Sequence, residues 1–215
     1  MNPLLMIAVA ILSLPLSACA QLYQPQYSAK SIDAWVVDAD TNAPIEGVIV
    51  VASWEILAGE MKARSRVMQM KILEMVTDKN GRFYFPAWGP EANPSAFGYM
   101  GYGPRLLLFK SEYRYLPLLN AASYTSESGS LRSSDWDGKT IKIQKAASDT
   151  SYLESFTNLY YVLDRMLTGE EEPCNWKRAP MVVAAVMKDE RRLKERGLPA
   201  MSSLTSSLRT NEEYF

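Results

Sequence analysis

An Asn-Gly pair between two runs of strand-forming residues constrains the fold of this chain more than any other feature. Residues 74–77 lead into Asp78-Lys-Asn-Gly81, and the second run occupies residues 82–88. Asn and Gly both tolerate positive φ, which a tight turn between antiparallel strands requires. The sequence therefore predicts a β-hairpin centred on Asn80 and Gly81.

Two further strands are predicted upstream of this hairpin. Residues 31–38 are a short apolar run, and residues 48–54 are the most β-branched segment of the chain. Pro and Gly in residues 40–47 predict the turn between them. The first strand is apolar on both faces, so we expect the C-terminal helices to cover the face that carries Trp35 and Val37.

Residues 67–76 permit two interpretations. Met68, Met70 and Ile72 alternate with polar residues, as in a half-buried strand, and a slip in phase after Ile72 indicates a β-bulge. The alternative is an amphipathic helix over about residues 59–76. We favour the strand because the segment runs directly into the predicted hairpin.

Residues 86–105 are dense in Gly, Pro and aromatic residues, which predicts a long loop without strands or helices. Its rings have two possible roles. If they are displayed, they would stack on a sugar or hold a small apolar ligand, and if they fold inward, they would cap one end of the core. The candidate binding residues are Trp88, Phe97, Tyr99 and Tyr102.

The chain changes from strand patterns to helix patterns near residue 149. Residues 106–109 and 139–145 are predicted strands, with residues 116–138 irregular between them. A capping box at Ser151 and Glu154 predicts a helix to about residue 167.

Pro180 predicts the start of a second helix, which ends before Gly197. Its first half, residues 181–187, is apolar on all sides and is expected to be buried. Its second half, residues 188–196, is strongly charged and is expected to face solvent, with Glu190 and Lys194 at a supportive spacing.

The segments at 36–50 and 77–86 resemble the carboxypeptidase regulatory-like domain. The resemblance implies a mainly β fold, a transthyretin-like or Ig-like β-sandwich of about seven strands. We place this domain at residues 31–146, a C-terminal two-helix extension at 147–200 and a flexible tail at 201–215. The matching motifs are turn and strand signatures, so they indicate fold and not function.

Composition argues against catalysis and metal binding. The 215 residues include no histidine, which excludes Ser-His-Asp and Cys-His catalysis and the usual zinc sites. A net charge of −1 argues against a general nucleic-acid binder. Asp38, Asp40 and Asn42 resemble the start of a calcium loop, but Ala43 and Ile49 replace residues that such a loop needs. We predict no enzyme, no metal and no cofactor.

The N-terminus resembles a lipoprotein signal peptide over residues 1–18. Its apolar run, residues 4–16, is shorter than the ~20 residues of a membrane span. Leu16-Ser-Ala-Cys19 then matches the lipobox of bacterial lipoproteins, which implies lipidation of Cys19. A secretory signal cleaved near Ala18 or Ala20 is the alternative. Residues 19–30 are a predicted tether, and Cys174 would be left unpaired.

These features predict a lipid-anchored protein of the bacterial outer membrane that faces the periplasm or the cell surface. The expected function is that of a non-catalytic interaction or scaffolding module with a protein partner in the envelope. The alternative is a glycan or small-ligand binding module that uses residues 86–105.

Overall fold

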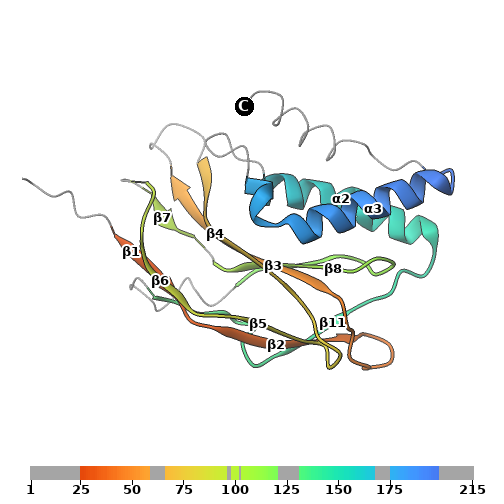
Figure 1. Ribbon diagram of the computed structural model, residues 1–215, viewed down its shortest axis with the longest axis horizontal. Helices are drawn as coiled ribbons and strands as arrows, with labels where there is room; N and C mark the ends of the chain where they lie inside the picture. Colours follow the sequence, from red (N-terminus) through yellow and green to blue (C-terminus); the bar gives the residue numbers. More distant parts are fainter. Residues whose placement is uncertain are drawn as a thin grey trace, which may run out of the picture.

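The computed structural model describes residues 25–58, 66–95, 98–101, 103–120, 131–167 and 175–198. Within these ranges the chain is mainly β, and two α-helices follow the strands (Figure 1). The strands are β1 (Gln26–Ala29), β2 (Ile32–Asp38), β3 (Ile49–Ala58), β4 (Arg66–Val76), β5 (Arg82–Phe85), β6 (Trp88–Ala92), β7 (Tyr99–Met100), β8 (Arg105–Phe109), β9 (Leu116–Leu118), β10 (Leu131–Arg132) and β11 (Thr140–Ile143). The helices are α2 (Asp149–Leu167), the 3-10 helix η2 (Asn175–Arg178) and α3 (Pro180–Glu195).

These elements stack in three layers (Figure 1). The first layer contains two sheets, with strand orders β10-β1-β6 and β11-β2-β5. The second layer is the sheet β4-β3-β8-β9, to which β7 is added by pairing with β3. Helices α2 and α3 cover the other side of this second sheet. The predicted β-sandwich with a C-terminal two-helix extension is confirmed, with more strands than the resemblance implied.

Strands β3 and β8 are apolar on both faces because both of their faces are covered. Trp54 and Leu108 belong to the core between the two sheets, whereas Val51 and Leu107 belong to the core beneath the helices. A continuous apolar run is typical of a strand that is buried on both sides. The prediction that the helices cover Trp35 on β2 is therefore wrong, since they cover β3 and β8 instead.

The hairpin predicted from residues 74–88 is wrong as a pairing of strands, because β4 pairs with β3 in one sheet and β5 pairs with β2 in the other. The predicted tight turn between the two strands is present, but it differs from the expected one. The Gly81 amide donates to the Asp78 carbonyl at 2.9 Å, and Gly81 has a φ of +72°. Asn80 is not among the residues with positive φ. This is a three-residue turn with glycine in the left-handed position, and not a two-residue Asn-Gly turn, and it leads the chain from the sheet of β4 to the sheet of β5.

Strand β4 confirms the strand interpretation of residues 67–76. The β-bulge, however, lies before Ile72 and not after it. Trp54 is opposite Lys71 and Glu55 is opposite Gln69, so Met70 is the extra residue. The partner strand β3 decided this position, because a bulge is defined by register between two strands.

Three stretches that were expected to be irregular contain short strands. Strand β1 lies inside the predicted tether, where Tyr27 is 7% exposed. Strands β6 and β7 and the first residue of β8 lie inside residues 86–105. Strands β9 and β10 lie inside residues 116–138. Strands β1, β6, β7 and β10 pair with strands that are distant in sequence, so local patterns carried no signal for them. Strand β9 instead pairs with β8, the strand before it.

Helix α2 begins before the position predicted from the capping box. The Ser151 amide donates to Ser148 Oγ at 3.2 Å, so Ser148 supplies the cap and the box at Ser151 and Glu154 is not the helix start. The helix buries one face, which includes Phe156, Leu159 and Leu163.

Helix α3 begins at Pro180, as predicted, and it is anchored to the sheet at that end. The amides of Met181 and Val182 donate to the two carboxylate oxygens of Glu74 on β4, at 2.8 and 2.5 Å. The first half of α3 is not buried on all sides, because Met181 is 40% exposed. The charged half is not uniformly solvated either, because Asp189 is 4% exposed.

Candidate functional site

Of the four predicted ligand-binding aromatics, the two in the described residues differ in exposure. Trp88, at the start of β6, is 9% exposed, and its ring packs edge-on against Trp54 with the ring centroids 5.3 Å apart. Tyr99 on β7 is 62% exposed. Phe97 and Tyr102 lie outside the described residues. Trp88 therefore takes the inward role, and Tyr99 the outward one.

A different pair of aromatic residues is displayed on the outer side of the sheet β11-β2-β5. Burial alternates along each of these strands, so every second side chain points away from the core. On this outer side Trp35 is 36% and Tyr84 is 43% exposed. Trp35 lies opposite Arg82 on the neighbouring strand, and Tyr84 lies opposite Asp33. We refer to the outward side chains of this sheet as the aromatic face: Asp33, Trp35, Val37, Arg82, Tyr84, Thr140 and Lys142.

An ion pair stiffens the aromatic face. Arg82 donates through Nε and Nη2 to the two carboxylate oxygens of Asp33, each at 2.7 Å. These hydrogen bonds are the main reason why the pKa of the Asp33 carboxyl is lowered. The Arg82 guanidinium also lies 6.0 Å from the centre of the Tyr84 ring. The Arg82 guanidinium and the Tyr84 ring are thus held in place before any partner binds, which lowers the entropic cost of binding.

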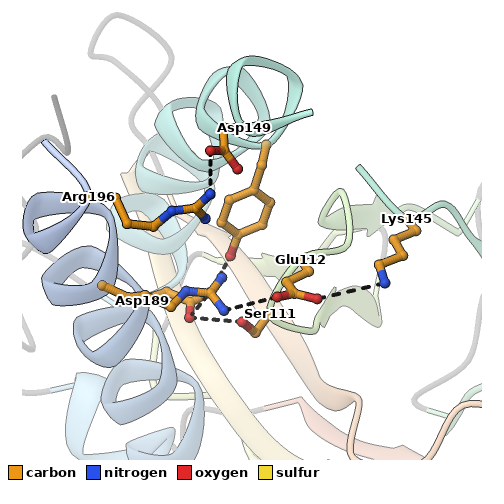
Figure 2. A network of polar contacts seen from close by, with 8 residues as sticks. Ser111, Glu112, Lys145, Asp149, Asp189 and Arg196 are labelled. Carbon is orange, nitrogen blue, oxygen red and sulfur yellow. Dashed lines mark hydrogen bonds and ion pairs between the residues drawn. The ribbon is translucent and has the colours of Figure 1, made fainter. Parts of the chain in front are cut away.

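A polar network joins the C-terminal half of α3 to the sandwich (Figure 2). Asp189 is at its centre: Ser111, which follows β8, donates its hydroxyl to Asp189 at 2.9 Å, and Tyr152 of α2 donates its phenol to the other carboxylate oxygen. Arg192 lies 3.6 Å from Asp189 and 3.3 Å from Glu112.

The outer part of the same network consists of exposed pairs. Glu112 extends it to Lys145, 3.8 Å away, and Arg196 at the end of α3 pairs with Asp149 at the start of α2 (Figure 2). The network therefore links both helices to the turn after β8 and to the end of β11.

The network holds the layers of the fold together through a buried phenol. Burial is the main cause that raises the pKa of Tyr152 well above its ordinary value, and the hydrogen bond to Asp189 adds to it. A phenol that stays protonated over the whole physiological range is a permanent donor. Asp189 accepts from the hydroxyls of Tyr152 and Ser111 and lies beside the guanidinium of Arg192. Sequence patterns offered no signal for this role, because Asp189 lies in a run of charged residues of both signs.

Other carboxylates of the described residues serve the fold in similar ways. Glu55 of β3 is 8% exposed and pairs with Arg105 at 3.3 Å and with Arg165 of α2 at 3.6 Å. Asp38 accepts the amides of Asp40 and Thr41, which confirms the turn interpretation of that stretch. Within the described ranges, no group of three or more His, Cys, Asp or Glu residues is placed to hold a metal ion.

Two features of the sequence analysis lie outside the described residues. These are Cys19, the predicted lipidation site, and Cys174, the predicted unpaired cysteine. In the part of the chain that the structure describes, no helix combines the length and the apolar character needed to cross a membrane.

No family model and no curated protein matches the sequence. Among solved structures, the 9R-lipoxygenase from Cyanothece is 15% identical with a TM-score of 0.29, covering 58% of this chain and 17% of that chain. The group B streptococcus pilus 2b backbone protein is 14% identical with a TM-score of 0.28, covering 55% and 42%. The 3-chlorocatechol 1,2-dioxygenase from Rhodococcus opacus is 15% identical with a TM-score of 0.29, covering 56% and 60%.

This chain therefore spans less than two thirds of the length of each of these structures. With TM-scores this low, the comparisons add no argument about fold or activity. The description as a β-sandwich with a helical extension rests on the strand pairing and on the two cores described above.

Proposed function

We propose that this chain is a lipid-anchored envelope protein whose β-sandwich is a non-catalytic module that binds another protein through the aromatic face. The observation that carries the proposal is the exposure of Trp35 and Tyr84 on a sheet whose outer side is covered by no other helix or strand of the described residues. The two helices that would have covered this side pack on the opposite sheet.

The residue types of the aromatic face are those that contribute most to protein–protein binding. Trp, Tyr and Arg are enriched among interface residues whose truncation costs the most affinity. Here they stand on paired strands, so their spacing is set by backbone register and not by a loop. The complementary partner surface is flat and apolar, with an acidic group to meet the exposed Lys142 on β11.

Two features of the sequence support the remaining parts of this proposal. Leu16-Ser-Ala-Cys19 follows an apolar run of signal-peptide length, which supports a lipid anchor. The absence of histidine from the sequence supports a non-catalytic role, because the common general base is missing. Lipid attachment would bring the module close to partners in the same membrane.

The test is in-cell crosslinking of the tagged full-length chain in its own cells, followed by binding measurements with the purified partner. Trp35→Ala and Tyr84→Ala are the test variants, and Cys19→Ala tests the anchor. Tyr161→Ala on α2 is the matched control, because Tyr161 is 64% exposed but lies on another layer. We expect each test variant to remain folded and to weaken binding by about tenfold or more.

Three results would contradict this proposal. The first is a partner that binds Trp35→Ala and Tyr84→Ala as well as it binds the unmodified chain. The second is equal loss of binding with Tyr161→Ala. The third is a polysaccharide, and not a protein, whose binding depends on Trp35 and Tyr84, since aromatic rings also stack on sugars.

A further inference from the structure

A groove on the helical side of the molecule has the composition of an anion-binding site. It lies between α3 and the part of the sandwich formed by the start of β3 and the end of β8, and its volume is about 540 Å³. This volume is in the range of small-molecule sites, which is roughly 300–1,000 Å³. The groove lies on the opposite side of the β3 sheet from the aromatic face, so it is independent of the function proposed above.

The groove has an excess of positive charge although the whole chain has a net charge of −1. Four basic and two acidic side chains line it. One of the acidic residues, Asp189, is already neutralised by the hydroxyls of Ser111 and Tyr152 and by Arg192. The other is the exposed Glu195, at the outer end of α3.

Three of the basic groups are available to a ligand. Lys188 and Arg191 are exposed, and among the described residues neither forms an ion pair or a side-chain hydrogen bond. Lys110 approaches from the sandwich side, where its ammonium donates to the carbonyl of Glu46 at 2.8 Å and retains two further donors. Cations from two layers of the fold therefore line the same groove.

Lys110 has a defined position because a glycine leaves room for it. Gly47 has a φ of +75°, and a Cβ at this position would lie 3.1 Å from the Lys110 ammonium nitrogen. The wall next to Lys110 is apolar: Phe109 is 2% exposed, and the half-buried Ile49 and Ala185 also line the groove. The groove thus combines a cationic side with an apolar wall.

We propose that this groove binds a phosphate monoester with an apolar organic part. The phosphate would contact Lys110, Lys188 and Arg191, and the organic part would lie along Ile49 and Ala185. A phosphate dianion offers three acceptor oxygens, which suits three separate cationic donors better than the two oxygens of a carboxylate do. The same chemistry is found in soluble phosphate esters and in the head group of phosphatidic acid.

Titration of the full chain, reconstituted in phosphatidylcholine vesicles, with hexyl phosphate tests this proposal. The bound fraction of hexyl phosphate, and separately of inorganic phosphate, is followed by the line width of the phosphorus NMR signal. Hexanol has no phosphorus and is tested as a competitor of hexyl phosphate. We expect saturable binding of hexyl phosphate, weaker binding of inorganic phosphate and no displacement by hexanol.

The double variant Lys188→Gln/Arg191→Gln should weaken hexyl phosphate binding by about tenfold or more, because it removes two charge-assisted contacts. The matched control is Lys79→Gln/Lys139→Gln, which removes two exposed charges away from the groove. Lys110→Met tests the sandwich side separately and should also weaken binding. Each variant alters one or two side chains that are not buried, so the fold is expected to persist.

Absence of saturable binding, or an equal effect of the control variant, would overturn the proposal. Two supporting results distinguish the source of the ligand. If phosphatidic acid in the vesicles competes with hexyl phosphate, the natural ligand is a lipid head group. If it does not compete, the ligand is a soluble ester. Neither result depends on the aromatic face, so this proposal and the one on protein binding fail separately.

Discussion

Replacement of Asp189 by alanine should be one of the most damaging single changes in the helical extension. The carboxylate is 4% exposed and accepts hydrogen bonds from Tyr152 and Ser111. Without it, the phenol of Tyr152, which is itself 5% exposed, loses its acceptor in a region with little access to water. A buried donor without a partner is destabilising because it has given up its hydrogen bonds to water.

The magnitude follows from what each partner loses. Breaking a buried ion pair costs about 3–5 kcal/mol when the remaining charge is stranded. Arg192 is not stranded, because its side chain is 34% exposed and it keeps Glu112 at 3.3 Å. The cost is then set mainly by the two hydroxyl donors, and we expect a loss of about 2–4 kcal/mol in the free energy of unfolding. At about 2–4 °C per kcal/mol for a chain of this size, Tm should fall by roughly 5–15 °C.

Thermal and urea unfolding followed by circular dichroism would measure this loss. Asp189→Asn is the conservative variant: it keeps the shape and one acceptor, so we expect a smaller cost, about 1 kcal/mol. Glu154→Ala is the control, because Glu154 is exposed on α2 and should be neutral. If Asp189→Ala lies within about 0.5 kcal/mol of the unmodified chain, the network does not stabilise the fold and the reasoning is refuted.

Three further predictions concern pH and backbone conformation. Burial is the main cause that raises the pKa of Glu74 above 4.5. The folded chain therefore holds this proton more tightly than the unfolded chain does. The free energy of unfolding should fall as the pH rises from 4.5 through the folded pKa. Glu74→Gln should flatten this slope in urea unfolding measured at a series of pH values. The raised pKa of Tyr152 should likewise make stability fall above pH 10, where the unfolded chain ionises first, and Tyr152→Phe should reduce that fall. Gly81→Ala should lower the free energy of unfolding more than Gly138→Ala does. Both positions have positive φ, which costs about 1–2 kcal/mol for alanine. At Gly81 the new Cβ would also lie 2.3 Å from the Val36 carbonyl oxygen.

Each of these three predictions has a result that would contradict it. An unchanged acid slope in Glu74→Gln would show that another carboxyl governs it. An unchanged alkaline profile in Tyr152→Phe would assign that profile to other tyrosines. Equal costs at Gly81 and Gly138 would show that the turn at Gly81 relaxes without loss of stability.

Local patterns predicted the elements that carry their own signal. Strands β4 and β5 with the turn between them, the β-branched β3 and the alternating β11 were all found at nearly their observed positions. That β4 and β5 join different sheets was not predicted, because it depends on which strands each of them meets in the fold. Helix α3 was found from Pro180, since a proline in the first turn is a local signal. Strand β1 was missed because its own residues carry no strand pattern, and the strand forms by pairing with β6 and β10.

The candidate sites were less predictable because exposure depends on what covers each surface. Trp35 and Val37 showed that β2 has a second apolar face, but nothing local showed that the helices would pack elsewhere. Trp88 and Tyr99 lie in the same aromatic-rich stretch, yet one is 9% and the other 62% exposed. Side chains so close in sequence cannot be assigned to core or surface without the strands that pack against them.

The sequence by itself determined the tight turn at residues 78–81, the strand-rich domain and the change to helices near residue 149, because periodicity and turn residues act over a few positions. The absence of histidine was equally a property of sequence alone. Only the tertiary structure decided which sheet the helices cover, and therefore that Trp35 and Tyr84 are left exposed. It also decided that Lys110 lies across a groove from Lys188 and Arg191, because these residues come from separate layers and are brought together by packing.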